Sequence, residues 1–248
     1  MDSTQDKEIL FREFFGGNDQ NFVAKFEEFR ALMVRYNCAV REVRTKFEVL
    51  NEELSYRTSR NPIESISSRI KTPMSIAEKL KRIGVPVTVD AIADHLNDVA
   101  GIRVICSFID DIYSVAEMLA KQDDITVVEI KDYIRNPKLN GYRSYHMIVE
   151  VPVFLSDSKQ IMRVEIQFRT VAMDFWASLE HQMRYKKQAA DRPDIAAELR
   201  SCAETIAATD ARMLGIRKRI EQMQETESRG AEPQGTGSQG TESQEKVL

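Results

Sequence analysis

The sequence has few of the residues and patterns that mark specialised classes of protein. Three cysteines among 248 residues, without a CxxC pair, argue against a disulfide framework and a structural zinc site. No apolar run approaches the ~18 residues of a membrane span, and acidic residues near the first position do not fit a signal peptide. Basic residues do not dominate either, because 35 Lys and Arg stand against 39 Asp and Glu. We therefore expect a cytoplasmic protein with reduced thiols, no membrane association and at most local binding of polyanions.

Long helices are predicted near both ends of the chain. Apolar residues recur three or four apart over 21–57, without Pro or Gly, and again over 193–226. At ~1.5 Å per residue the first helix would span roughly 50 Å, so we expect part of it to contact another subunit in a homo-oligomer. Residues 1–20 form an N-terminal extension. Residues 227–248, rich in Gly, Ser, Thr, Gln and Glu, are expected to be a disordered tail.

The middle of the chain changes to the two-residue alternation of β-strands. Four short runs rich in Val and Ile fit strands: 101–108, 125–131, 144–153 and 161–168. A helix capped by Asp110 is expected after the first run, and another follows Thr170. The pattern predicts an α/β fold of the α+β type, with a mixed four- to five-stranded sheet flanked by helices. Residues 21–226 are expected to form one domain, with a catalytic core at 66–187.

The alternation sorts the strand residues onto two faces. Three strands combine an apolar face with a polar one, which carries Arg103, then His146 and Glu150, then Arg163, Glu165 and Gln167. For any single strand, an antiparallel sheet with its polar residues in water is the commoner explanation. The convergence of Arg, His and Glu over three strands favours a functional site on this face.

Residues 69–84 hold five basic residues and one acidic residue, the densest positive segment of the chain. Ser75 and Glu78 fit a capping box, so we expect a helix that starts at Ser75 and carries Lys79 and Arg82 on one face. The N–H groups at a helix N-terminus and neighbouring cations both attract phosphate. The segment therefore predicts a polyphosphate site, with a solvated basic helix as the alternative.

Two further segments fit a nucleotide site. Asp98 stands just before the first predicted strand, where its carboxylate suits a magnesium ion shared with phosphates; a helix cap or turn is the alternative.

The connection 131–146 is far longer than a hairpin turn, and long loops in compact domains are often functional. Its tip carries Lys138 and Tyr142, a charge for phosphates and a ring whose stacking on a base is worth ~1 to 3 kcal/mol. A surface tyrosine on a turn is the alternative.

Four separated motifs occur along the chain: RIKxxxSIxEK, LNDVAGIRV, NGYRSYH and VEIQFRTVAMDFWASLEH. Together they resemble the synthetase domain of the RelA/SpoT family, and more narrowly the small alarmone synthetases of the RelQ and RelP type. The resemblance covers about 21–187 and implies a nucleotidyltransferase-like fold. It also implies an enzyme of the stringent response, which transfers pyrophosphate from ATP to the ribose 3′-hydroxyl of GDP or GTP with Mg²⁺, releasing AMP and giving ppGpp or pppGpp.

The resemblance implies roles for individual residues. Glu165 is the expected base for the 3′-hydroxyl, His146 lies near the phosphates, and Asp98 and Glu165 bind Mg²⁺. The residues expected to bind ATP are Arg69, Lys71, Ser75, Lys79, Arg82 and Arg103. Of these, Arg69 and Arg103 are expected on either side of the adenine. The residues expected at GDP or GTP are Lys131, Lys138, Tyr142, Gln167, Asp174 and Glu180, with the tyrosine stacked on guanine.

The resemblance also bears on assembly and on alternative activities. It implies a homo-oligomer, a tetramer in the RelQ type. The three histidines, His95, His146 and His181, leave no His-Asp metal motif, so no hydrolase activity is expected. Some toxic relatives modify the 3′ end of tRNA or make adenosine alarmones, so tRNA and adenine nucleotides are alternative acceptors. A non-catalytic protein that binds nucleotides or single-stranded RNA through the same basic face is a further alternative.

Overall fold

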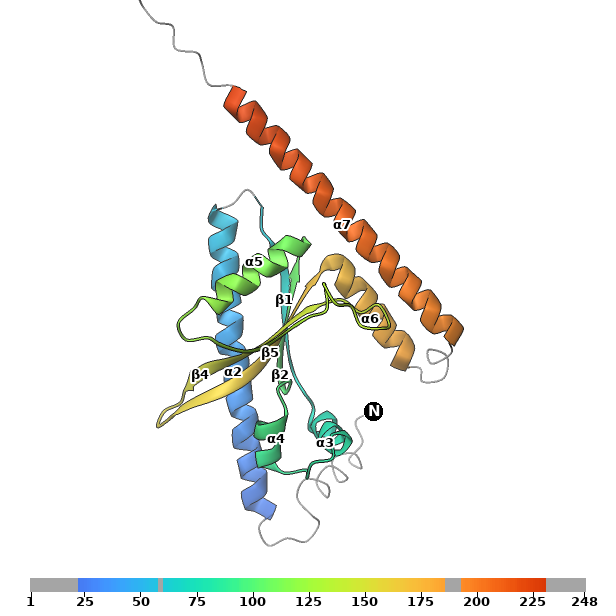
Figure 1. Ribbon diagram of the computed structural model, residues 1–248. Helices are drawn as coiled ribbons and strands as arrows, with labels where there is room; N and C mark the ends of the chain where they lie inside the picture. Colours follow the sequence, from blue (N-terminus) through green and yellow to red (C-terminus); the bar gives the residue numbers. More distant parts are fainter. Residues whose placement is uncertain (1–21, 58–59, 186–192, 231–248) are drawn as a thin grey trace, which may run out of the picture.

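A five-stranded sheet forms the centre of the computed structural model, which describes residues 22–57, 60–185 and 193–230 (Figure 1). The strands are β1 (Ile63–Ile70), β2 (Ala100–Cys106), β3 (Thr126–Asp132), β4 (Tyr145–Phe154) and β5 (Lys159–Thr170). Their order across the sheet is β1-β2-β5-β4-β3. Only β2 and β5 pair in parallel, so the predicted mixed sheet is confirmed.

The sequence predicted four of the five strands and missed β1. The apolar residues of β1 are Ile63, Ile66 and Ile70, which stand three and four apart as in a helix. Because β1 lies at an edge of the sheet, most of its side chains are exposed and no two-residue alternation is needed. Its register nevertheless positions the site, because Arg69 stands opposite Gly101 and Ser67 opposite Arg103.

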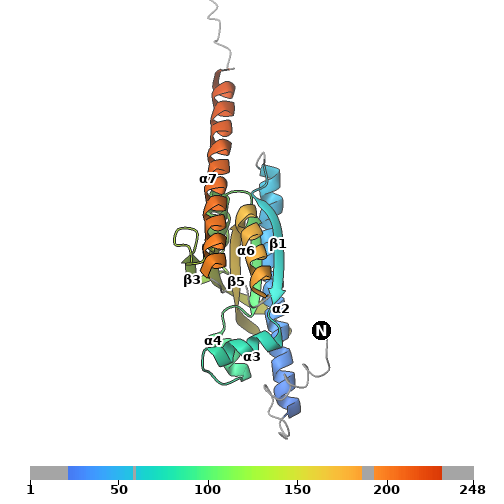
Figure 2. The ribbon, with the colours of Figure 1, turned by 90° about the vertical axis from the view of Figure 1, so that its right-hand side faces the viewer.

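Among the described residues, six helices surround the sheet: α2 (Phe22–Arg57), α3 (Pro73–Arg82), α4 (Val89–His95), α5 (Ile109–Ala120), α6 (Val171–Tyr185) and α7 (Pro193–Gly230). Helix α2 packs across the apolar face and buries Tyr36, Val43 and Phe47. Helix α5 adds Ile112 and Leu119 to the same core. Figure 2 shows α2 and α7 on opposite sides of β5. The apolar face of the sheet is therefore covered by α2 and α5, which leaves its polar face for a site.

Two predicted helix caps are wrong. Helix α3 begins at Pro73 with Thr72 as its cap, because the Ser75 N–H donates to Thr72 Oγ1 at 3.3 Å. Proline suits the first helical position, so the Thr-Pro pair overrides the proposed Ser75 capping box. Asp110 does not cap α5; the carboxylate of Asp111 accepts from the Phe108 N–H at 3.2 Å. The short helix α4 was not predicted.

Helix α7 differs from the prediction at its end. It continues to Gly230, so the prediction of disorder is wrong for 227–230. The C-terminal part of α7 projects beyond the sheet (Figure 1). The predicted N-terminal extension at 1–20 and the rest of the predicted tail lie outside the described residues. Within the described part of the chain, no helix is long and apolar enough to cross a membrane.

Candidate active site

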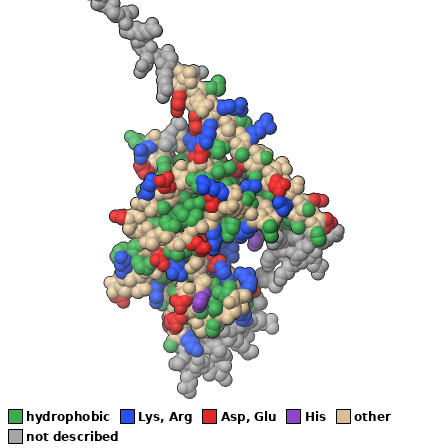
Figure 3. Space-filling model, in the orientation of Figure 1, with side chains coloured by type: hydrophobic (Ala, Val, Ile, Leu, Met, Phe, Trp, Pro, Cys, Tyr) green, Lys and Arg blue, Asp and Glu red, His purple; other side chains and the backbone are tan. Residues whose placement is uncertain are grey.

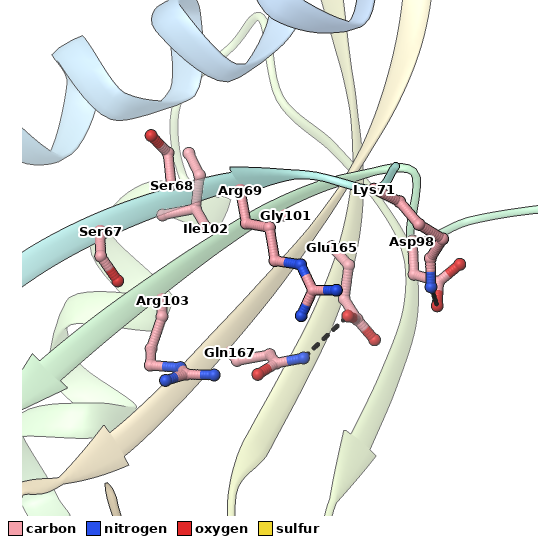
Figure 4. A pocket seen from close by; sticks show the side chains of 10 residues that line it. All are labelled: Ser67, Ser68, Arg69, Lys71, Asp98, Gly101, Ile102, Arg103, Glu165 and Gln167. Carbon is pink, nitrogen blue, oxygen red and sulfur yellow. Dashed lines mark hydrogen bonds and ion pairs between the residues drawn. The ribbon is translucent and has the colours of Figure 1, made fainter. Parts of the chain in front are cut away.

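A cavity of about 400 Å³ opens on the polar face of β1, β2 and β5. Its lining residues come from these strands and from the segments that flank them: Ser67, Ser68, Arg69, Lys71, Asp98, Gly101, Ile102, Arg103, Glu165 and Gln167 (Figure 4). In the space-filling view the chain is hollowed between α3 and α6, and Lys and Arg side chains lie around this hollow (Figure 3). Five residues predicted from the sequence to bind ATP, Mg²⁺ or the acceptor thus share one cavity with Glu165.

The register of the strands explains why these side chains meet. In one row across the sheet, Arg103 stands opposite Gln167, Gln167 opposite His146, and His146 opposite Lys131. In the neighbouring row Glu165 stands opposite Gly101. Because successive residues of a strand point to opposite faces, each row places its polar side chains on the same side.

Asp98 lies at the basic end of the cavity. Its Oδ2 is 2.8 Å from Lys71 Nζ and 2.6 Å from Lys79 Nζ. Burial alone would raise the pKa of Asp98, but the hydrogen bonds from the two lysines outweigh burial and hold its pKa below the usual value. Its other oxygen, Oδ1, is buried and has no hydrogen-bond partner among the described residues. Asp98 is therefore ionised at neutral pH and keeps one oxygen available for a ligand.

Glu165 lies in the same cavity and is held on both carboxylate oxygens. Gln167 Nε2 donates to Oε2 at 2.9 Å, and His146 Nδ1 is 3.4 Å from Oε1. Burial raises the pKa of Glu165, whereas the contacts with His146 and Gln167 lower it further, so the net shift is downward. Glu165 is consequently an oriented carboxylate, ionised at neutral pH.

Asp98 and Glu165 fit a divalent cation that also binds the substrate. The two carboxylates line one cavity, and the negative charge of Asp98 acts on the titration of Glu165. Among the described residues, no group of three or more His, Cys, Asp or Glu is arranged to hold a metal ion. Mg²⁺ is commonly bound by one or two carboxylates together with phosphate oxygens and water. The pair therefore suits Mg²⁺ brought in with a polyphosphate better than a permanently bound metal.

The residues predicted to bind ATP divide into two groups. Arg69, Lys71 and Arg103 line the cavity, and Lys79 reaches it through Asp98. Ser75 and Arg82 lie on α3 and are not among the lining residues. Ser75 Oγ instead accepts a hydrogen bond from the hydroxyl of Thr72, the cap residue of α3, at 2.9 Å.

Most of the residues predicted to bind the acceptor are linked to Tyr142 directly or through one neighbour, beside the cavity. The Tyr142 hydroxyl is 2.9 Å from His146 Nε2, and Lys138 Nζ is 4.9 Å from the centre of the tyrosine ring. Lys138 is also 4.6 Å from the ring centre of Tyr133, which the sequence analysis did not single out. Lys131 is paired with Glu129 at 2.9 Å, and this hydrogen bond raises the pKa of the lysine.

Helices α6 and α7 hold the loop that carries Tyr142. Asn140 Nδ2 donates to Glu180 Oε1 on α6 at 3.0 Å. Gly141 has φ +88°, and a Cβ at this position would lie 2.5 Å from the Cβ of Ala203 on α7. The loop is thus seated directly on α7, a contact that no local sequence pattern indicates.

Arg169 also belongs to this group and was missed by the sequence analysis. It follows Glu165 and Gln167 on the polar face of β5, so a continuation of the same alternation by one step would have found it. Its Nη2 donates to the Tyr142 hydroxyl at 2.8 Å, and its Nη1 donates to Asp174 Oδ1 at 2.9 Å.

Comparison with known proteins identifies the family. Residues 68–190 match the region found in RelA/SpoT proteins. GTP pyrophosphokinase YwaC of Bacillus subtilis (strain 168) is 42% identical over 195 residues, which cover 79% of this chain and 93% of the relative. This chain belongs to the RelA/SpoT family. GTP pyrophosphokinase YjbM of the same organism is 35% identical over 203 residues, covering 82% of this chain and 95% of the relative.

Solved structures of RelA/SpoT family members share the fold. Small alarmone synthetase 1 from Bacillus subtilis, bound to its product pppGpp, matches with a TM-score of 0.72 and 35% identity, covering 78% of this chain and 98% of that one. The same synthetase bound to AMPCPP matches with a TM-score of 0.68 and 33% identity, covering 79% and 99%. The resemblance to small alarmone synthetases is therefore confirmed, and the chain is an enzyme of the synthetase type.

Proposed function

We propose that this protein makes ppGpp and pppGpp. The β,γ-pyrophosphate of ATP is transferred, with Mg²⁺, to the ribose 3′-hydroxyl of GDP or GTP, and AMP is released. The observation that carries the proposal is the cavity in which Asp98 and Glu165 lie among Arg69, Lys71 and Arg103. The named activity of the relatives and the nucleotides in the similar structures support the same substrates.

The donor ATP binds along β1, β2 and α3 in this proposal. Arg69 and Arg103 extend into the cavity from neighbouring strands, and their planar guanidinium groups suit stacking on adenine. Lys71 and Lys79 are paired with Asp98 before substrate binds. A triphosphate offers them more negative charge than one carboxylate does, so we expect them to turn to the phosphates and release Asp98. Ser75 and Arg82 lie on α3 outside the cavity lining, and their contact with the phosphates stays a prediction.

The reaction needs a proton acceptor and an in-line attack on the β-phosphorus. Asp98 and Glu165 would hold Mg²⁺, which would supply charge neutralisation on the phosphates. Glu165, ionised because of its lowered pKa, accepts the proton of the 3′-hydroxyl. The 3′-oxygen then forms a bond to the β-phosphorus, the bond to the bridging α,β-oxygen breaks, and AMP leaves. Holding both nucleotides in line and neutralising charge account for most of the rate enhancement.

His146 keeps Glu165 oriented in this scheme. The Tyr142 hydroxyl accepts a hydrogen bond from Arg169 Nη2 and lies 2.9 Å from His146 Nε2. When this hydroxyl donates to Nε2, a neutral imidazole carries its proton on Nδ1, which faces Glu165. The chain of contacts from Arg169 through Tyr142 and His146 therefore ends on the carboxylate that receives the 3′-hydroxyl proton.

The acceptor nucleotide binds on the side of Tyr142. We propose that the tyrosine ring stacks on guanine and that Lys138 and Lys131 face the acceptor phosphates. Lys138 lies over the tyrosine ring before substrate binds, so a base that stacks on that face displaces it. Gln167, Asp174 and Glu180 shape the acceptor site, and Glu180 does so through the hydrogen bond from the loop residue Asn140.

An acceptor-competition assay tests the proposal. Purified protein is mixed with ATP, Mg²⁺ and either GDP, GTP, ATP alone or tRNA, and the products are identified by mass spectrometry. We expect AMP and a guanosine 3′-diphosphate, with GDP or GTP outcompeting the other acceptors. If the pyrophosphate is found on tRNA or on adenosine, that molecule is the acceptor and not the guanine nucleotide. If protein with an intact active site releases no AMP with any acceptor, the synthetase reaction is refuted.

We also propose that the protein is a homo-oligomer, with a tetramer as the expected state. Four apolar side chains on α6 are between 41% and 59% exposed and stand four residues apart, which forms one stripe: Val171, Phe175, Leu179 and Met183. Such a stripe is unusual on a monomeric surface and supports burial against a second copy of the chain. Light scattering in solution tests the state. Binding of single-stranded RNA stays a prediction, to be tested by its dependence on salt.

A further inference from the structure

Arg169 occupies an unusual position for an arginine. It lies on the polar face of β5, yet it is only 5% exposed. A buried guanidinium is costly unless its N–H groups are paired. Two of its nitrogens are paired with groups of the candidate site, so the burial serves contacts within that site.

The contacts of Arg169 converge on the acceptor side. Nη2 donates to the Tyr142 hydroxyl at 2.8 Å and lies 3.4 Å from Gln167 Oε1. The guanidinium carbon is 5.2 Å from the centre of the Tyr142 ring, within the range of a cation–π contact. Arg169 therefore restrains both the hydroxyl and the ring of the tyrosine.

A carboxylate fixes Arg169 in turn. Asp174 Oδ1, at the start of α6, accepts from Arg169 Nη1 at 2.9 Å and is 3.3 Å from Arg103 Nη1. The two arginines thus share one carboxylate oxygen, and burial together with the charge of Arg169 lowers the pKa of Arg103. If Arg169 were shortened, Asp174 would still be available to Arg103, so the donor side would keep its partner.

We propose that Arg169 is a positioning residue for the acceptor nucleotide, acting through Tyr142. This inference rests on the proposed function, because it takes Tyr142 to be the platform for the acceptor base. The guanidinium holds the tyrosine in place before the base arrives, so less order has to be created on binding. Arginine suits this role because two separate nitrogens of its planar fork reach Asp174 and the tyrosine hydroxyl, whereas lysine has one nitrogen to place within reach of both.

The test compares Arg169→Lys with the wild type by calorimetric titration with GDP and with a non-hydrolysable ATP analogue. We expect the Kd for GDP to rise about 10-fold, the factor that corresponds to ~1.4 kcal/mol, and the Kd for the ATP analogue to change less than about 2-fold. A double-mutant cycle with Tyr142→Phe separates positioning from a general loss of structure. In the Tyr142→Phe background, Arg169→Lys should weaken GDP binding by less than about 3-fold.

Arg217→Lys is the matched control. Arg217 on α7 is also largely buried, contacts Asp110 and lies 4.9 Å from the ring centre of Phe108, so the same change removes similar contacts outside the site. It should lower the melting temperature and leave both Kd values within about 2-fold. Equal losses of GDP and ATP-analogue affinity in Arg169→Lys, or full additivity in the cycle, would overturn the inference, as would a wild type that binds no GDP. A wild type that binds GDP but forms no alarmone would refute the proposed function alone.

Discussion

Replacement of Gly141 by alanine tests whether α7 holds the loop that carries Tyr142. Gly141 has φ +88°, a conformation that costs an L-residue about 1 to 2 kcal/mol. The added methyl group would also lie 2.5 Å from the Cβ of Ala203, closer than two carbons can approach, so the loop or α7 must move. Gly84 provides the matched control, because it has φ +76° and nothing within 4 Å of an added Cβ. Both substitutions carry the free-energy cost of an L-residue at positive φ, and only Gly141→Ala also displaces Tyr142.

The measurement is the KM for the acceptor, with the KM for ATP as reference, together with urea unfolding. We expect a free-energy loss of about 1 to 2 kcal/mol in Gly84→Ala with both KM values unchanged. Gly141→Ala should lose at least as much stability and raise the acceptor KM about 10-fold, equivalent to ~1.4 kcal/mol of lost positioning. Ala203→Gly removes the clashing atom, since the next contacts of the new Cβ are with the Arg200 backbone at 3.6 Å. The double variant should recover the acceptor KM, although glycine in a helix costs about 1 kcal/mol. Equal acceptor KM values in the two glycine variants, or no recovery in the double variant, would refute the reasoning.

Three further predictions concern the carboxylates and the attachment of α7. Glu165→Gln should lower kcat about 100-fold, whereas Glu150→Gln, whose carboxylate is paired with Arg163, should change kcat by less than 3-fold. Because the pKa of Asp98 lies below its ordinary 3.8, its contribution to stability is complete above that pH and is lost as the pH falls through the lower, folded value. The difference in unfolding free energy between wild type and Asp98→Asn should therefore shrink below about pH 4; a constant difference contradicts this. Arg217→Ala should cost about 1 to 3 kcal/mol by urea unfolding, because it removes the closest partner of Asp110 among the described residues and leaves it only Lys218 at 3.5 Å.

The residues of the site could be found from the sequence where local patterns determine them. Alternation places Arg103, Glu165 and Gln167 on the polar face, and the structure has them on one cavity wall. Their meeting with Asp98 depends on the parallel pairing of β2 with β5, which only the whole fold establishes. The resemblance to the family supplied that information, because its motifs imply the fold.

Other features depend on contacts between distant segments and could not be predicted locally. Strand β1 has the three- and four-residue spacing of a helix and is a strand because β2 provides its hydrogen-bond partners. The seat of Gly141 on Ala203 joins a loop to a helix far along the chain. Thr72 and Pro73 did contain a local signal for the start of α3, and this signal outweighed the Ser75 capping box.

Binding of a divalent ion in the presence of a donor analogue tests the central claim most directly. Mn²⁺ can be titrated by electron paramagnetic resonance in place of Mg²⁺, with a non-hydrolysable ATP analogue present. If Asp98 and Glu165 share one ion with the phosphates, Asp98→Asn and Glu165→Gln should each weaken Mn²⁺ binding about 10-fold or more, and Glu150→Gln should not. Unchanged Mn²⁺ affinity in either site variant would contradict the account, because the two carboxylates would then not hold the same ion.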